Sequence, residues 1–195
     1  YKTIVSASEG IYKEKGSKFL AFAIPVNSVE EIKEIIKEYR KKYFDARHVC
    51  YAYMLGHERK DFRANDDGEP SGTAGRPILG QINSHDLSNV LVVVVRYFGG
   101  ILLGTGGLVT AYREAAADAL DQAEIVEKLV EKDLLIEFDY GVMNDVMKLF
   151  KDEKLIQIDP EFDLRCRIKT LVRLSEVPRI LDNFAKIEGL KVTEI

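Results

Sequence analysis

One apolar run between two glycine-rich segments constrains the fold of this chain more than any other feature. The run from Val90 to Phe98 begins with unbroken aliphatic residues, and because it lacks polar alternation it predicts a strand buried on both faces. Residues 66–77 before it read DDGEPSGTAGRP, and residues 99–107 after it read GGILLGTGG. Glycine adopts backbone conformations that other residues resist and permits close backbone approach. The two segments therefore predict loops that meet a ligand or a partner.

Composition limits the class of protein. A chain of 195 residues suffices for one large or two small domains, and 46% hydrophobic with 31% charged residues is a globular composition. No apolar run approaches the ~20 residues that a membrane helix needs, and the visible start, with Lys2 and Lys13, does not resemble a signal peptide. A net charge of −4 argues against strong nonspecific binding to nucleic acid.

The two cysteines indicate the compartment. Cys50 and Cys166 are far apart, form no CxxC motif and have no histidine at ligand spacing. Neither a disulfide framework nor a structural zinc site is expected. The simplest location is therefore the cytoplasm.

The first part of the chain mixes strands and helices. Two strands are expected within residues 3–26, around the polar turn 15–18. Ser28 and Glu31 form a capping box at the start of an amphipathic helix. Further expected elements are a strand at 48–55, a short helix at 76–84, the buried strand at 90–98 and an alanine-rich helix at 108–123.

The second part has a different order. Alternating apolar residues predict strands at 134–138 and 164–168. Two short strands are expected at 155–158 and 190–195. Two helices are also expected, and Ser175 is the candidate cap of the second. The order is βαββαβ, the ferredoxin-like split βαβ arrangement. The charged stretch 127–132 marks the boundary, which gives domains 1–130 and 131–195 of an α+β protein.

The acidic loop allows two interpretations. Asp66, Asp67 and Glu69 place three carboxylates within four residues, which suits a Mg²⁺ or Ca²⁺ site or an acid/base pair. They also suit a solvated turn, in which Asp and Gly serve the turn geometry. The turn is favoured, because there is no EF-hand spacing and no histidine partner. No metal and no cofactor are expected.

The turn from Gly104 to Gly107 is the second candidate. Free N–H groups at the start of a helix favour an anion, although the segment is neither a Walker A loop nor a complete dinucleotide fingerprint. The alternative is a tight strand-to-helix turn. Arg96 and Arg113 bracket the turn and could hold a phosphate or pair with the acidic loop. We expect the two loops to converge, with at least one of the three carboxylates within salt-bridge range of one of these arginines.

Two further clusters have ordinary explanations. His48 and Cys50 share a strand face and could form a catalytic dyad, but a core cysteine is commoner. Arg165, Arg167 and Lys169 share one strand face that could meet RNA, but RNA-binding sheets usually add stacking aromatics. Glu137 and Asp139 on a neighbouring strand make cross-strand ion pairs the better explanation.

These residues together resemble the YigZ/IMPACT family. The matching motifs are KGSKF at 15–19, HVCYAY at 48–53, DDGEPSGTAG at 66–75 and RYFGG at 96–100, continuing to Leu108. The resemblance implies a first domain related to the second domain of a small-subunit ribosomal protein, β-rich with helices on one face. It implies a second domain similar to one in elongation factor G. Eukaryotic IMPACT proteins are implicated in translational control through a kinase activator, but the RWD domain that precedes the motifs there is not in this sequence, so that partner is not carried over.

The residues and the resemblance together favour a cytoplasmic binding or regulatory factor associated with translation, with RNA, the ribosome or a translation factor as candidate partners and no membrane. The alternative is a phosphate- or metal-dependent enzyme built on the two glycine loops. No established reaction accompanies the bacterial family, and no catalytic residue or oligomeric state is assigned. The candidate ligand-binding residues come from the two loops and the strand between them: Asp66, Asp67, Glu69, Ser71, Thr73, Arg76, Arg96, Tyr97, Gly99, Gly100, Gly104, Gly106, Gly107 and Arg113.

Overall fold

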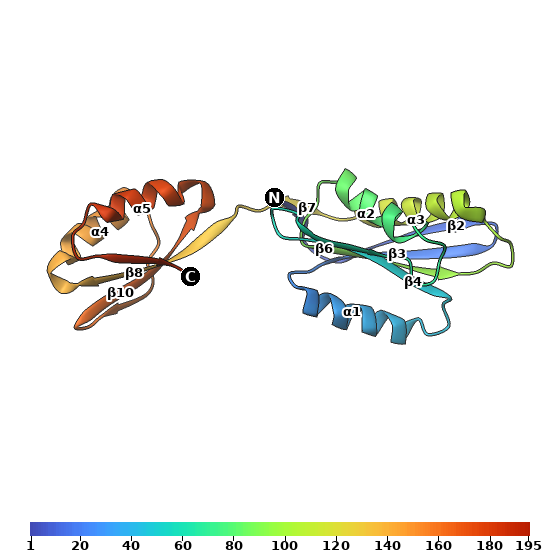
Figure 1. Cartoon of the computed structure of the whole chain (residues 1–195), viewed down its shortest axis with the longest axis horizontal. Helices are drawn as coiled ribbons and strands as arrows, with labels where there is room; N and C mark the ends of the chain where they lie inside the picture. The colour runs from blue at the N-terminus through green and yellow to red at the C-terminus, as the bar shows by residue number, and fades with distance from the viewer. The chain divides into compact units, whose positions relative to one another are not determined.

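The computed structural model describes residues 1–195 and divides them into two compact units, Tyr1–Lys128 and Leu129–Ile195 (Figure 1). The boundary lies two residues before the one expected from the sequence. Both units combine helices with sheet, so the fold is α+β. None of the helices has the length and apolar character needed to pass through a bilayer.

A five-stranded antiparallel sheet forms the centre of the first unit, in the order β2-β3-β6-β4-β5. The central strand is β6, and every residue from Val90 to Val95 is fully buried, as the unbroken apolar run predicts. Neither β5 at the exposed edge nor the small pair β1-β7 was predicted from the sequence. The strand bounds are β1 Lys2–Ile4, β2 Ser8–Glu14, β3 Ser17–Pro25, β4 His48–Leu55, β5 Asp61–Asn65, β6 Val90–Tyr97 and β7 Ile125–Glu127.

Helices cover both faces of this sheet, with α1 on one face and α2 and α3 on the other (Figure 1). The capping box at the start of α1 is confirmed, because the Glu31 N–H donates to Ser28 Oγ at 3.2 Å and the Glu31 carboxylate accepts the Asn27 N–H at 2.8 Å. The family resemblance implied that helices lie on only one face of this sheet, and that expectation is wrong. The helix bounds are α1 Val29–Lys42, α2 Gly75–Ser84 and α3 Gly104–Asp121.

The alanines of α3 let the helix lie close to the sheet. A Cβ added at Gly10 in β2 would lie 2.3 Å from the Ala119 nitrogen, so this glycine is required by close approach rather than by a turn. The fully buried alanines on this helix are Ala111, Ala115, Ala116 and Ala119.

The second unit has the predicted βαββαβ element order, with strands in the order β11-β8-β10-β9. Both helices pack on one face of the sheet (Figure 1). Two local expectations are wrong: the second strand begins at Ile158 rather than near Leu155, and Ser175 lies in a 3₁₀ turn and does not cap the last helix. The bounds are β8 Glu131–Asp139, α4 Met143–Asp152, β9 Ile158–Phe162, β10 Arg165–Arg173, α5 Val177–Ala185 and β11 Lys191–Glu194.

Candidate functional site

The two glycine-rich segments meet at one pocket in the first unit, with a volume of about 320 Å³. The acidic loop forms one wall, the segment after β6 forms the other, and the start of α3 closes the end. The expected convergence of the loops is therefore confirmed. The pocket is lined by Arg47, His48, Glu69, Pro70, Arg96, Phe98, Leu102, Leu103, Gly104, Thr105 and Leu108.

A buried ion pair lies at the floor of this pocket. Arg96 Nη1 donates to Glu69 Oε1 at 2.5 Å, and the two side chains are only 7% and 3% exposed. The Tyr112 hydroxyl donates to the same oxygen at 2.7 Å, and His48 Nε2 lies 3.7 Å from it. Burial, together with nearby Cys50 and Glu69, raises the pKa of Tyr112, so its phenol remains a hydrogen-bond donor. The predicted approach of an acidic-loop carboxylate to Arg96 is confirmed.

Asp66 has a different role, because its carboxylate accepts hydrogen bonds from backbone N–H groups at the start of α2. Oδ1 accepts the backbone N–H groups of Ala74 and Gly75 at 3.1 and 2.8 Å, and Oδ2 accepts that of Gly72 at 2.9 Å. Burial favours the neutral acid, but these three hydrogen bonds outweigh it and lower the pKa of Asp66. This carboxylate acts as a helix cap supplied from outside the helix.

Asp67 ties the loop to β4 and α1. Its Oδ2 accepts the Val49 N–H at 2.7 Å, its Oδ1 lies 3.2 Å from Arg40 Nη2, and its carbonyl accepts a hydrogen bond from His48 Nδ1 at 2.7 Å. Because a carbonyl only accepts, the Nδ1 of His48 carries a proton. The three acidic residues thus have separate protein partners, and no group of three or more His, Cys, Asp or Glu residues is placed to hold a metal ion.

The start of α3 is the most open part of the site. Leu103 precedes the helix and provides no side-chain cap, and Gly104, Thr105 and Gly106 are exposed. Two guanidinium groups lie beside this end of the pocket. Arg47 and Arg96 lie 5.1 and 5.6 Å from the centroid of the Phe98 ring, and the buried Nε of Arg96 has no hydrogen-bond partner. Free N–H groups, the exposed Arg47 and the unpartnered Nε of Arg96 together favour a negatively charged ligand.

Several candidate residues lie elsewhere. Tyr97 donates to Asp45 at 3.0 Å and packs on the α1 face of the sheet, and Arg113 pairs with its neighbour Glu114 at 3.6 Å on the surface. The Thr73 hydroxyl donates to the Pro70 carbonyl at 2.6 Å within the loop. The remaining residues of this kind, which do not line the pocket, are Ser71, Arg76, Gly99, Gly100, Gly106 and Gly107.

The glycines of the second segment serve different ends. A Cβ at Gly99 would lie 2.0 Å from the Gly16 carbonyl carbon, so this residue is required where two backbones touch. Gly100 and Gly104 have φ values of +89° and +72°, which other residues rarely adopt. Gly106 has neither property, since nothing lies within 4 Å of an added Cβ. Backbone geometry therefore does not require a glycine at position 106.

The apolar walls and one cation of the pocket were not predicted from the sequence. Phe98 and Leu102 are 37% and 82% exposed, and Arg47 lies outside both glycine segments. Large apolar residues beside a pair of glycines are the sequence signal that could have identified the first two. Arg47 reaches the site only because its strand neighbour pairs with β6, with His48 opposite Arg96.

Cys50 is a core residue with a hydrogen bond. Its thiol donates to the Asp66 carbonyl at 3.1 Å and lies 3.4 Å from the Tyr112 hydroxyl. Burial raises the pKa of the Cys50 thiol, which makes a reactive thiolate unfavourable. The structure thus agrees with the core interpretation rather than with a His48–Cys50 dyad.

The basic strand of the second unit pairs with acidic neighbours. Arg167 Nε lies 3.4 Å from Glu137, and Lys169 Nζ lies 3.8 Å from Asp159. Arg165 is the register partner of Asp139. The expectation of cross-strand ion pairs is confirmed for Arg167 and Glu137.

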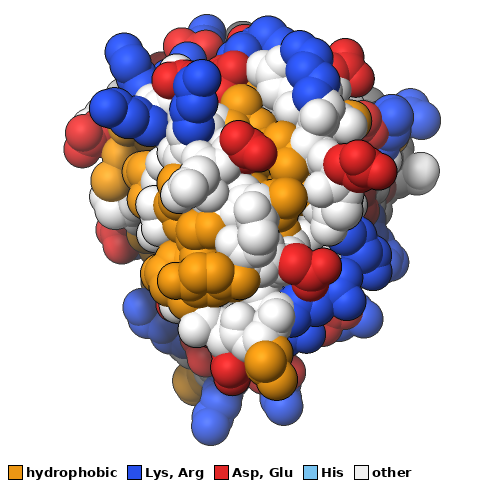
Figure 2. Space-filling view, turned by 90° about the vertical axis from the view of Figure 1, so that its left-hand side faces the viewer, with side chains coloured by type: hydrophobic (Ala, Val, Ile, Leu, Met, Phe, Trp, Pro, Cys, Tyr) orange, Lys and Arg blue, Asp and Glu red, His pale blue; other side chains and the backbone are white.

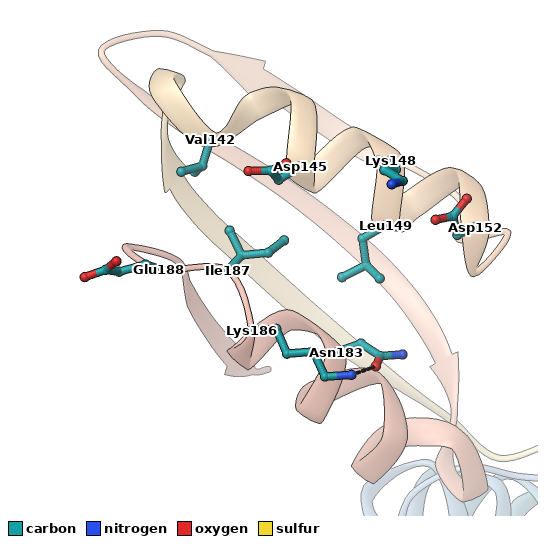
Figure 3. Close-up of a pocket in the computed structure, with 9 residues that line it drawn as sticks. All are labelled: Val142, Asp145, Lys148, Leu149, Asp152, Asn183, Lys186, Ile187 and Glu188. Atoms are coloured by element: carbon teal, nitrogen blue, oxygen red, sulfur yellow. Dashed lines mark hydrogen bonds between the residues drawn. The ribbon is translucent and has the colours of Figure 1, made fainter.

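A second hollow, of about 470 Å³, lies between α4 and the end of α5 (Figure 3). Leu149 and Ile187 point toward each other across it, and Lys186 donates to Asn183 at 3.0 Å. Its rim carries charges of both signs. Figure 2 shows similarly mixed charges around hydrophobic side chains that reach the surface of this unit. Neither feature selects one class of ligand.

Comparisons with known proteins agree on one family. The sequence model of the family described as the Impact N-terminal domain matches residues 15–120 of this chain. IMPACT family member YvyE of Bacillus subtilis is 31% identical over 176 residues, which cover 90% of this chain and 81% of that protein. IMPACT family member YigZ of Escherichia coli is 36% identical over 149 residues, 74% of this chain and 73% of that one. A crystal structure described as that of a hypothetical protein has a TM-score of 0.74 and 28% identity, and covers 100% of this chain and 97% of that one. The glycine-rich motifs that build the pocket lie within the matched domain, and this chain belongs to the IMPACT family.

Proposed function

We propose that this protein is a binding factor in the control of translation and that it holds an anionic ligand in the pocket of its first unit. The family supports the link to translation, because the eukaryotic IMPACT proteins that it resembles are implicated in translational control. The observation that carries the proposal is the uncapped start of α3 beside Arg47 and Arg96.

The charges of the pocket support an anion. Arg47 and Arg96 contribute two positive charges, and Glu69 contributes one negative charge. The helix start adds a partial positive charge of about half a unit. Since the whole chain carries −4, attraction to an anion depends on this local site rather than on the overall field.

The enzyme alternative has less support. Asp66, Asp67 and Glu69 each already accept hydrogen bonds from protein groups, and together with nearby His and Cys residues they form no group of three or more placed to hold a metal ion. The raised pKa of Cys50 likewise opposes a role as nucleophile. A binding role requires only the cations and the helix start.

The partner is proposed to be RNA, the ribosome or a translation factor. The similarity of the first domain to a ribosomal-protein domain, and of the second to an elongation factor G domain, is part of this proposal. The proposed similarity of the second domain is supported by its strand order. β10 lies between β8 and β9, as a split βαβ unit requires.

Co-sedimentation with ribosomes at moderate salt tests the proposal. Arg47→Gln removes an exposed cation of the pocket and should reduce the bound fraction several-fold. The matched control is Arg63→Gln, which removes an exposed arginine from β5, outside the pocket. Nuclease treatment before sedimentation separates RNA-mediated from protein-mediated binding.

The second unit provides the contrary outcome. If Arg165→Ala with Arg167→Ala abolishes sedimentation while Arg47→Gln does not, the recognition surface lies on β10 and the pocket assignment is wrong. If the parent protein does not sediment with ribosomes under any condition, the ribosome is not the partner.

A further inference from the structure

The pocket has an apolar side that anion binding alone does not explain. Its walls include Pro70, Leu103 and Leu108. The segment after β6 extends this surface outward, since Ile101 and Leu102 are 56% and 82% exposed. Exposed apolar side chains that continue a pocket are typical of a site that receives an apolar group.

The polar end lies at the start of α3. The N–H groups there have no capping side chain, and Arg96 lines the same pocket with a buried Nε that has no partner. A neighbouring helix start shows which group satisfies such N–H donors, because the Asp66 carboxylate accepts three backbone hydrogen bonds at α2. At α3 no protein side chain caps the helix start, so a carboxylate could accept hydrogen bonds from its N–H groups in the same way.

We propose, building on the proposed function, that the ligand is the free carboxyl terminus of a polypeptide whose last residues are apolar. The terminal carboxylate would accept hydrogen bonds from the start of α3 and pair with Arg47 and Arg96. The apolar side chains would lie against Phe98 and Leu102. Capture of a chain end in this way is a known mode of peptide recognition.

The charge and size of the pocket favour a chain end over a nucleic acid. Arg47, Arg96 and Glu69 leave one net positive charge, which matches a single carboxylate. A polynucleotide would need further cations along its backbone, and no other lysine or arginine lines the pocket. The volume of about 320 Å³ is at the low end of the roughly 300–1,000 Å³ found for small-molecule sites.

Fluorescence polarisation with the full chain tests this inference. The probe is a peptide labelled at its amino end, with the sequence Gly-Ser-Gly-Ala-Leu-Leu and a free carboxyl group. The matched probe has the same sequence and a carboxamide end. The free acid should bind at least about tenfold more tightly, because the amide loses charge-assisted hydrogen bonds.

Two pairs of variants locate the binding. Arg47→Gln and Leu102→Asp should each weaken binding of the free acid at least about fivefold. Arg63→Gln on β5 and Leu164→Asp in the second unit make the same chemical changes at exposed positions outside the pocket and should have no effect. All four changes are at exposed side chains, and a thermal melt of each variant verifies folding.

The outcomes separate this inference from the proposed function. Equal affinity for acid and amide, or binding that Arg47→Gln and Leu102→Asp leave unchanged, overturns the inference. If the peptide fails but a short oligouridylate binds in a manner that depends on Arg47, the anion site stands and its ligand is RNA. If neither probe binds, both the inference and the anion site are wrong.

Discussion

Removal of Arg96 gives the sharpest test of the pocket floor. In Arg96→Met, the Glu69 carboxylate keeps its hydrogen bond from Tyr112 but loses its ion-pair partner, while its side chain remains only 3% exposed. Breaking a buried pair by removing one partner costs about 3–5 kcal/mol, because the remaining charge is buried and uncompensated.

This cost is large compared with the stability of a domain, which is about 5–15 kcal/mol. For a unit of this size, each kcal/mol corresponds to roughly 4 °C in Tm, so the first unit should melt about 12–20 °C lower. The double variant Glu69→Gln with Arg96→Met removes both charges. Replacing both partners of a buried pair is often nearly neutral, so the double variant should recover most of the loss.

Thermal melts and urea titrations of the full chain, followed by circular dichroism, measure both changes. The transition of the second unit serves as an internal control, since Arg96 and Glu69 belong to the first unit. A loss below about 1 kcal/mol in Arg96→Met would refute the inference that an uncompensated charge remains buried. A double variant no more stable than Arg96→Met would refute the assignment of the loss to that charge.

Three further predictions concern other parts of the chain. Asp66→Ala should destabilise the first unit by about 1–2 kcal/mol through loss of the α2 cap. Because the pKa of Asp66 is lowered on folding, its contribution is complete above the unfolded value near 3.8 and is lost as the pH falls through the lower folded value. Melts at pH 7 and pH 3 should therefore show the difference shrinking at acid pH. Gly99→Ala should destabilise by about 2 kcal/mol or more through the backbone clash with Gly16, whereas Gly106→Ala should stabilise by up to about 1 kcal/mol; equal effects in denaturant titrations would contradict the contact geometry. A fragment of residues 129–195 should melt cooperatively by circular dichroism, and an unfolded fragment would show that the second unit depends on the first.

The elements with a strong apolar pattern were predicted from the sequence. The strand His48–Leu55 and the buried strand beginning at Val90 were expected with the observed bounds or within a residue of them. The strand Asp61–Asn65 was missed because it is a mostly exposed edge strand, so burial imposes no apolar alternation on it. The long helix begins at Gly104 and not at Leu108 as expected. The first turn was missed because glycines are typical of turns.

The candidate site was partly predictable, and local geometry explains the errors. Successive residues of a strand point to opposite faces, so Arg96 and Tyr97 do not both face the pocket. Successive residues of a helix lie about 100° apart, so Tyr112 points inward while Arg113 points to solvent. The choice between Arg96 and Arg113 required the three-dimensional placement of α3 against β6.

The acidic loop also determines how a ligand meets the pocket. Its three carboxylates connect it to α2 through Asp66, to β4 through Asp67, and to β6 and α3 through Glu69. Ordering a free loop on binding costs about 1–2 kcal/mol per backbone residue in conformational entropy, but here that ordering accompanies folding. The loop wall of the pocket is thus preorganised, and a ligand that fits it loses little affinity to the ordering of this wall.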